Sequence, residues 1–513
     1  MTERGASPAT WLGFGALTLG LFMAVLDIQI VVTSLPEIST ALGIPADRMS
    51  WVQTAYLVAE VIAIPLTGLL TRALGLRRLF TIAILVFTAA SLACAASGGF
   101  ESLVAARIVQ GFAGGVLIPV VFSAVFLLFP ERQQGLATTL GGVMAVLAPT
   151  VGPLLGGFIT QTWSWPWLFL VNVLPGLAAA LVAGGALPRD DGDRAALRRL
   201  DGGGLLLMAV ALAALEIGLK QAPRHGWLSP GVLGLLALAL LAGIAFARRS
   251  LRRDSPVVDL AALADRDFAI GCLLSFVLGL GLYGSVYLMP VFLAFVREQG
   301  PLEIGQVMLV TGAAQLVTAP LAVELEKRVD GRWLMAFGFA LFAVGLGLGA
   351  FQTWESDFDA MLLPQVLRGS AIMFCLLPPT RLALGHLPPE RVADASGLFN
   401  LMRNLGGAIG LALIDTVIFG RAPVLGEAIG QRLKAGDVTV APLVGIPAET
   451  VASASSRIID AALVELVRPL VERAALVEAI NEAWLMLAVL TAAALLALPW
   501  VRKGSSPPRD DGR

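Results

Sequence analysis

WLGFGALTLGLFMAVLDIQIVVTS, residues 11–34, is an almost uninterrupted apolar run whose only charged residue is Asp27. As an α-helix it would extend about 36 Å at roughly 1.5 Å per residue, enough to cross a hydrocarbon core about 30 Å thick. No small-residue cleavage site followed by a soluble domain comes after the run. We therefore interpret it as a retained membrane span and not as a signal peptide.

Apolar runs of similar length recur along the whole chain. Of the 513 residues, 57% are hydrophobic and only 14% are charged, whereas about a quarter of the residues of a soluble protein are charged. We predict an all-α polytopic membrane protein with fourteen transmembrane helices. Their expected ranges are 12–34, 51–70, 79–97, 102–128, 135–159, 167–187, 203–220, 228–247, 268–296, 304–325, 333–352, 359–385, 395–418 and 483–501.

The basic residues set the expected orientation, because cytoplasmic loops are enriched in lysine and arginine. An even number of spans with the N-terminus inside places the arginine clusters in the inner loops and leaves few basic residues outside. Both termini are then cytoplasmic, with tails at 1–10 and 503–513. One long outer connection, 419–482, separates the last two spans. Within it, 452–483 has the apolar spacing of an amphipathic helix, which fits a solvated spacer as well as a docking surface.

Composition excludes several other classes of protein. The formal net charge of −1 gives no electrostatic reason to expect a nucleic-acid partner. The three cysteines lie far apart in separate apolar runs, and only two histidines occur, so neither a disulfide framework nor a metal centre is indicated. The chain contains no phosphate-cradling Gly-x-x-x-x-Gly-Lys-Ser/Thr loop, which argues against an ATP-driven pump. We expect no cofactor beyond a proton gradient.

Ionisable residues inside the apolar spans are the main candidates for function, because charge is costly in lipid. Asp27, Glu60 and Arg107 are expected at similar depth in the first half, where two carboxylates sharing one arginine could bind and release a proton. The alternative is that Arg107 neutralises one carboxylate and fixes helix packing. Glu216 and Lys220 lie one turn apart and are expected to satisfy each other.

Polar residues in otherwise apolar spans are candidates to line a cavity for weakly polar, lipophilic compounds. Each of them could instead form a hydrogen bond between helices. The candidates are Gln53, Tyr56, Asn172, Tyr283, Tyr287, Asn400 and Arg403.

Glycines spaced four apart indicate an internal repeat. Gly152 and Gly156 in the fifth span match Gly406 and Gly410 in the thirteenth, and such spacing lets helices approach closely. If spans seven and eight are an insertion, spans five and thirteen each become the fifth helix of a six-helix half. The expected units are 11–190 for the N-terminal half, 191–250 for the two additional helices and 251–502 for the C-terminal half.

Several motifs in the same order resemble one known family. They occupy residues 26–36, 51–56, 107–115, 148–157, 165–176, 256–260, 387–391, 400–410 and 481–484. Together they are similar to the fourteen-span drug:proton antiporters of the major facilitator superfamily, on the EmrB/QacA side. The resemblance implies a major facilitator fold and proton-coupled export of lipophilic compounds by alternating access across an inner membrane. It also implies a periplasmic EmrA-like adaptor and an outer-membrane channel as partners. A facilitator or symporter for a defined metabolite is the alternative.

Two motifs of this family concern conformational change. The antiporter motif of span five contains Pro149, Gly152, Pro153, Gly156 and Gly157; its prolines bend a helix, and its glycines are expected to permit tight crossing against the opposite half as a sealed hinge.

The second motif is the gate loop after span two, which contains Gly68, Arg72, Gly75, Arg77 and Arg78. The superfamily usually has an aspartate at the position of Arg72, where it is thought to help latch the cytoplasmic gate. The arginine therefore puts that latch in doubt.

Overall fold

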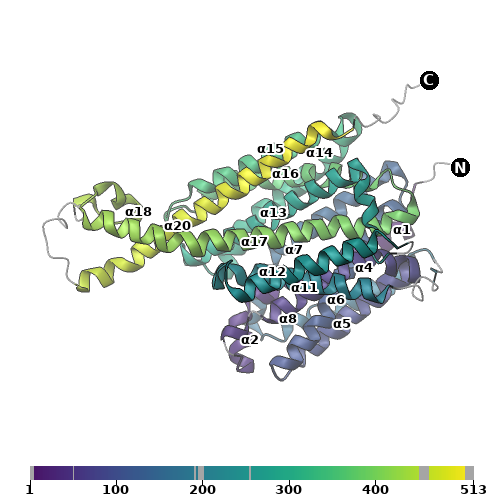
Figure 1. The fold of residues 1–513 in the computed structure, drawn as a ribbon, viewed down its shortest axis with the longest axis horizontal. Coiled ribbons are helices and arrows are strands. Elements are labelled where there is room, and N and C mark those ends of the chain that lie inside the picture. The colour runs from purple at the N-terminus through teal and green to yellow at the C-terminus, as the bar shows by residue number, and fades with distance from the viewer. Residues whose placement is uncertain are drawn as a thin grey trace.

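The computed structural model describes residues 5–44, 46–49, 51–189, 192–193, 201–253, 256–449 and 461–502. Within these ranges every regular element is helical, and the long helices lie side by side (Figure 1). Thirteen of the described helices are long and apolar enough to cross a membrane. A fourteenth, α7, bends by 47° between Pro149 and Leu154. The expected fourteen-span, all-α fold is confirmed.

The N-terminal half consists of six long helices around one apolar core, to which residues between Phe14 and Leu187 contribute. Its long helices are α1 (Pro8–Thr33), α4 (Trp51–Leu74), α5 (Leu76–Ala95), α6 (Phe100–Leu128), α7 (Glu131–Thr162) and α9 (Val173–Ala186). The short helices are α2 (Leu35–Leu42), α3 (Ala46–Met49) and α8 (Trp167–Leu170).

The C-terminal half repeats this arrangement around a second core, drawn almost entirely from residues between Leu274 and Val501. Its long helices are α13 (Arg266–Phe295), α14 (Pro301–Arg328), α15 (Gly331–Leu348), α16 (Phe358–Leu384), α17 (Pro389–Lys434) and α20 (Ala461–Ala493). The short elements are η1 (Leu260–Ala264), η2 (Gly349–Phe351), η3 (Val438–Val440), α18 (Ala441–Val444) and η4 (Ala494–Trp500).

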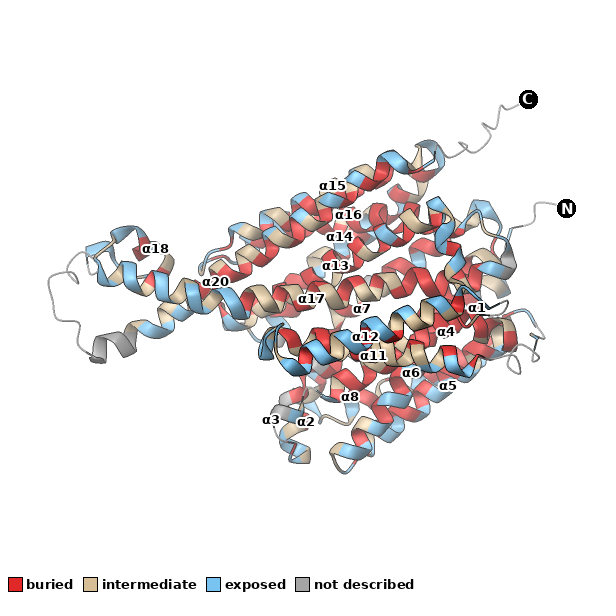
Figure 2. Ribbon diagram, in the orientation of Figure 1, coloured by how far each residue is buried: buried red, intermediate tan, exposed pale blue. Residues whose placement is uncertain are grey.

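Two further helices, α11 (Gly202–His225) and α12 (Pro230–Ser250), form a hairpin that packs through α11 on α4 and α17. Hydrogen bonds from the Arg249 guanidinium hold the pKa of Asp201 at about 2, so this pair fixes the start of α11 to the end of α12 at neutral pH. Much of α12 is exposed (Figure 2), including Leu240 and Leu241, and this apolar surface suits contact with lipid.

Both termini lie at the same end of the bundle, called here the termini side (Figure 1). At the opposite end, α17 and α20 extend beyond the other helices as a projecting hairpin. The connection expected over 419–482 is therefore largely a continuation of the two spans: α17 ends only at Lys434, and α20 begins at Ala461. Residues 452–460 of the expected amphipathic helix lie outside the described residues.

The helix α17 runs on because no strong terminator occurs until Gly436, whose φ of 74° suits glycine. Pro423 lies inside α17 without ending it. The projecting hairpin has its own small apolar core, formed by Ile429, Val444, Ala474 and Ala475. At its base, Arg421 Nε forms an ion pair of 2.7 Å with Glu482.

Candidate functional site

A buried carboxylate in α1 is the centre of the most strongly connected polar cluster in the N-terminal half. Asp27 is 1% exposed, and its Oδ2 forms an ion pair with Arg107 Nη1 of α6. Its Oδ1 accepts hydrogen bonds of 2.9 Å from both Gln110 Nε2 and Asn172 Nδ2. Each carboxylate oxygen therefore has a donor inside an otherwise apolar bundle.

Arg107 is held by groups other than Asp27 as well. Its Nε donates to the Val52 carbonyl at 3.1 Å, and its Nη1 donates to Gln110 Oε1 at 2.7 Å. The guanidinium carbon lies 4.3 Å from the centre of the Tyr56 ring, which supports it by a cation–π contact. Loss of the Asp27 charge would thus leave the arginine fixed in place.

Sequence reasoning missed Gln110 and Ser91. Gln110 Nε2 also donates to Ser91 Oγ of α5 at 2.9 Å, which joins a third helix to the cluster. The signal for Gln110 was its spacing, because a residue three positions after Arg107 lies on the same helix face. Asn172, expected in a substrate cavity, instead lies on Asp27.

Glu60 is arranged differently from Asp27. It is 5% exposed on α4, and it has no hydrogen bond or ion pair within the described part of the chain. Its strongest electrostatic neighbour is Glu216 of α11, ahead of Arg107 and Asp27. Arg107 therefore contacts one carboxylate directly, whereas two were expected to share it.

The additional hairpin makes a polar contact with the N-terminal half. Lys220 Nζ of α11 donates a hydrogen bond to Thr54 Oγ1 of α4. Glu216 lies one turn before Lys220 on the same helix. The contact of Lys220 with α4 therefore places Glu216 near Glu60. The expectation that Glu216 and Lys220 only satisfy each other was incomplete.

The C-terminal half contains a related motif with the order of residues reversed. Arg107, Gln110 and Gly111 of α6 correspond in position to Gln365, Arg368 and Gly369 of α16, counted from the start of each helix. Arg368 is 3% exposed and stacks on the Trp484 ring at 4.7 Å. It has no acidic partner within the described ranges. Of the two halves, therefore, only the N-terminal one pairs the buried arginine of its fourth long helix with a carboxylate.

The remaining cavity candidates do not form one group. Tyr283 Oη of α13 donates to Asn404 Oδ1 at 3.0 Å, and Tyr287 Oη donates to Asp415 Oδ1 at 2.7 Å. The other four occupy separate places.

Asn400 donates to the Ser396 carbonyl of its own helix at 2.9 Å. Arg403 lies between the halves, 5.3 Å from the Phe122 ring of α6. Gln53 is half-buried near the start of α4, and Tyr56 supports Arg107.

Gly152 of the antiporter motif faces its own half. A Cβ atom on Gly152 would collide with Gln29 of α1, and the Gly156 carbonyl accepts a hydrogen bond of 3.4 Å from Ser34 Oγ. The expectation of a tight crossing against the opposite half was wrong for Gly152, because α1 is the helix packed on this face of α7. Gly406 in α17 lies in the same way against the Phe276 carbonyl of α13.

Contact between the halves near the bend of α7 comes from a different residue. Leu154 Cβ lies 2.7 Å from where a Cβ on Gly305 of α14 would stand. Pro149 and Gly157 are buried in α7, and Pro153 falls within the bent segment. The proline-containing segment therefore changes helix direction at the point where α7 meets the other half.

The gate loop joins the two halves at the termini side. Arg72 at the end of α4 forms an ion pair with Asp394 of α17, so the position that raised doubt about a latch carries an ion pair between the halves, with the arginine on α4. Gly68 allows this approach, because a Cβ there would strike the Asp394 backbone. Gly75 adopts a φ of 78°, which turns the chain into α5.

The last two arginines of the gate loop have different surroundings. Arg77 Nη1 donates to the Leu187 carbonyl at 3.5 Å, and Arg78 is exposed.

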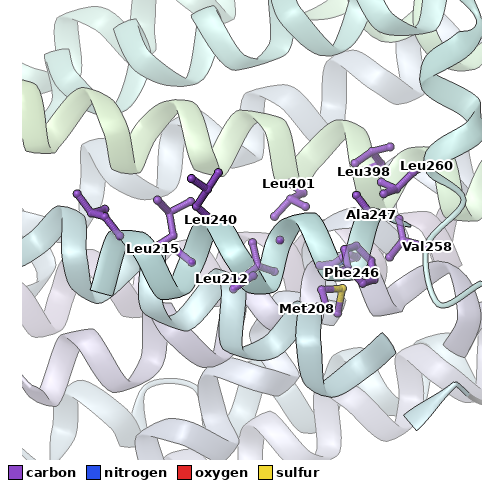
Figure 3. Close-up of a pocket in the computed structure, with 15 residues that line it drawn as sticks. Met208, Leu212, Leu215, Leu240, Phe246, Ala247, Val258, Leu260, Leu398 and Leu401 are labelled. Atoms are coloured by element: carbon purple, nitrogen blue, oxygen red, sulfur yellow. The ribbon is translucent and has the colours of Figure 1, made fainter. Parts of the chain in front are cut away.

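An apolar pocket of about 510 Å³ lies between the additional hairpin and α17 (Figure 3). Met208, Leu212 and Leu215 line it from α11, and Leu398 and Leu401 line it from α17. The lining includes Pro65 of α4, so the pocket reaches the seam between the halves.

Two six-helix bundles with buried ionisable groups, joined by a two-helix hairpin, define a polytopic membrane transporter. The sequence matches the model of the Major Facilitator Superfamily over residues 17–411, and the chain belongs to that superfamily.

Its relatives include two EmrB proteins. The colistin resistance protein EmrB of Acinetobacter baumannii is 39% identical over 80% of this chain and 81% of the relative. The multidrug export protein EmrB of Escherichia coli is 33% identical over 78% and 79%. The chain is thus an EmrB-like member of the superfamily. The human organic anion transporter MFSD10 has the same fold, with a TM-score of 0.60 at 15% identity over 96% of this chain and 100% of that one.

Proposed function

We propose that this protein is a proton-coupled antiporter that exports lipophilic or amphipathic drugs and toxic compounds by alternating access. The observation that carries the proposal is the buried pair of Asp27 and Arg107. A carboxylate in this position can exist either ionised on the arginine or protonated, and the balance between the two forms shifts when its surroundings change. The names of the EmrB relatives support drug export.

The proton would bind Asp27 while the site communicates with the outside. Protonation removes the charge that holds Arg107 Nη1, while Val52, Gln110 and Tyr56 keep the guanidinium in place. The α1–α6 contact would weaken without collapsing, which suits a reversible step. One proton crossing 100 mV supplies about 2.3 kcal/mol, enough to sustain roughly a fifty-fold gradient of a neutral compound.

In this scheme 11–190 and 251–502 move as two halves, and the hairpin within 191–250 covers their seam. The ion pair of Arg72 with Asp394 closes the termini side, which we assign to the cytoplasm on the distribution of basic residues. Lipophilic substrates dissolved in the bilayer would reach the seam through the apolar pocket beside α11.

We place the protein in an inner membrane with both termini in the cytoplasm. The projecting hairpin of α17 and α20 then extends into the periplasm, where a membrane-fusion adaptor of the EmrA type could contact it and lead to an outer-membrane channel. Support for this comes from the small separate core of the hairpin, which gives it a shape of its own beyond the bundle.

Proton-linked flux of a fluorescent lipophilic dye in inside-out vesicles tests the coupling. Asp27→Asn mimics the protonated carboxylate permanently, so dye-induced proton release and concentrative uptake are expected to be lost. Glu60→Gln is the matched control, because it removes a buried carboxylate that has no ion pair. Its flux is expected to be lower than that of the wild type but still linked to protons. Unchanged coupling in Asp27→Asn would contradict the proposal.

A facilitator or symporter for one metabolite is the alternative on the same fold. Uptake that persists at the same rate after the proton gradient is collapsed would favour the facilitator.

A further inference from the structure

Arg403 is a buried cation at the boundary between the two halves. It lies on α17 and is 7% exposed. Its guanidinium carbon is 5.3 Å from the ring centre of Phe122 in α6 of the opposite half and 5.4 Å from that of Phe399 in α17. Aromatic rings from both halves therefore surround this charge.

The guanidinium has spare hydrogen-bonding capacity. Nε and Nη2 of Arg403 are buried without a partner among the described residues. The hydrogen bonds of Tyr283 and Asn400 go to Asn404 and to Ser396, and neither residue bonds to Arg403. No acidic residue in the described ranges forms an ion pair with it. Cation–π contacts alone compensate little of the cost of burying a charge, so the site favours an anion.

The other two buried arginines among the described residues show what is unusual here. Arg107 has the carboxylate of Asp27, so its charge is already balanced. Arg368 also lacks an acidic partner, but it stacks on Trp484 of α20 within its own half. Among these three, Arg403 alone combines an unbalanced charge with contact across the boundary.

We propose that Arg403 binds the anionic group of lipophilic organic acids, and that Phe122 and Phe399 contact the apolar body of the same molecule when the halves part. A guanidinium presents two parallel N–H donors that match a carboxylate, which gives selectivity for anions over neutral or cationic analogues. This inference rests on the proposed transport function and names a substrate class for the same central boundary.

Three naphthalene compounds with one ring system and different head groups test the selectivity. Binding of 2-naphthoate, 2-naphthamide and 2-naphthyltrimethylammonium to the purified full chain in lipid nanodiscs would be measured by fluorescence. The wild type is expected to bind the carboxylate about tenfold or more tightly than the amide, because hydrogen bonds to charged groups are the stronger ones. Equal affinity for the two in the wild type would overturn the proposal without any variant.

Arg403→Gln should reduce affinity for 2-naphthoate about tenfold or more and leave the amide within about twofold. Arg368→Gln is the matched control, since it removes an equally buried, stacked arginine, and the preference for the carboxylate should persist. An equal loss of affinity for all three compounds in Arg403→Gln, or loss of the preference in Arg368→Gln, would contradict a site at Arg403.

The two proposals fail in different ways. If the wild type moves 2-naphthoate or a cationic dye along with protons but prefers no anion, the anion site is wrong and the transport function stands. If it binds 2-naphthoate with the expected preference but shows no proton-linked flux of any probe, the anion site stands and the coupling is wrong.

Discussion

Single residues explain why a charge can be kept in α1 of an apolar bundle. Both carboxylate oxygens of Asp27 have donors, and these come from α6 and from Asn172, just before α9. Hydrogen bonds offset the cost of burying an ion pair, and here they reach both carboxylate oxygens and Arg107 Nε and Nη1, while Arg107 Nη2 has no partner among the described residues. The cluster therefore depends on Gln110 as much as on the two charged residues.

Gln110→Ala is expected to lower stability and slow proton-linked export together. It removes one of the two donors to Asp27 Oδ1 and one of the two acceptors of Arg107 Nη1, at a cost of about 1–3 kcal/mol. Thermal unfolding in detergent and dye flux in vesicles measure the two effects. Gln134→Ala is the control, because Gln134 donates to the Phe129 carbonyl away from the cluster. Equal unfolding midpoints for the two variants would refute the role given to Gln110.

The sequence indicated Asp27 and Arg107 because charged residues stand out in apolar runs. It did not indicate Ser91 or Gln110 clearly, since uncharged polar residues are common in membrane helices and gain partners only when α5 and α6 pack together. For the same reason Asn172 could be assigned to a cavity, although its amide lies on Asp27.

At the scale of elements, an ion pair between α4 and α17 joins the two halves at the termini side. Arg72 and Asp394 are on helices of opposite halves, so their ion pair opposes separation of the halves. The sequence located the loop but not its partner, because Asp394 lies more than 300 positions away and only the folded chain brings the two together.

Reversing the two charges should distinguish the effect of the ion pair from the effect of losing either side chain. Arg72→Asp and Asp394→Arg each place like charges together and are expected to reduce dye export at least about tenfold. The double variant restores an attractive pair and should recover most of the activity. Expression and unfolding midpoints provide the control for misfolding. A double variant no better than either single one would argue against a latch.

Helix ends were the least predictable feature of the elements. The drop in hydropathy after residue 418 was interpreted as the end of a span, yet α17 continues to Lys434. Loss of apolar character marks where a helix leaves lipid, and a helix ends only where its backbone finds a cap or a glycine such as Gly436. The projecting hairpin forms because α17 continues beyond the end of its apolar segment.

At the scale of the whole molecule, the projecting hairpin can be shortened without entering the bundle. Gly426 of α17 and Ala475 of α20 face each other, with 3.6 Å between a Cβ added to the first and the Cβ of the second. A short glycine linker between them would replace 427–474. Proton-linked dye flux in vesicles is expected to stay within about twofold, whereas resistance of intact cells should fall if an adaptor contacts the hairpin.

The control for shortening the hairpin is cellular resistance with the full-length chain at matched expression. Full resistance with the shortened chain would show that the adaptor does not need the hairpin. Loss of flux in vesicles would show instead that the hairpin supports the bundle.

The pairing of Asp27 with a residue 80 positions later has a consequence for biosynthesis. Ribosomes add about 5–20 residues per second, so Asp27 is made about 4–16 s before Arg107. An unpaired aspartate in a span is costly during insertion by the translocon, up to about 2.5–3.5 kcal/mol at the helix centre. The nascent helix is therefore expected to remain beside the translocon, or to enter lipid with its carboxyl group protonated, until the arginine emerges.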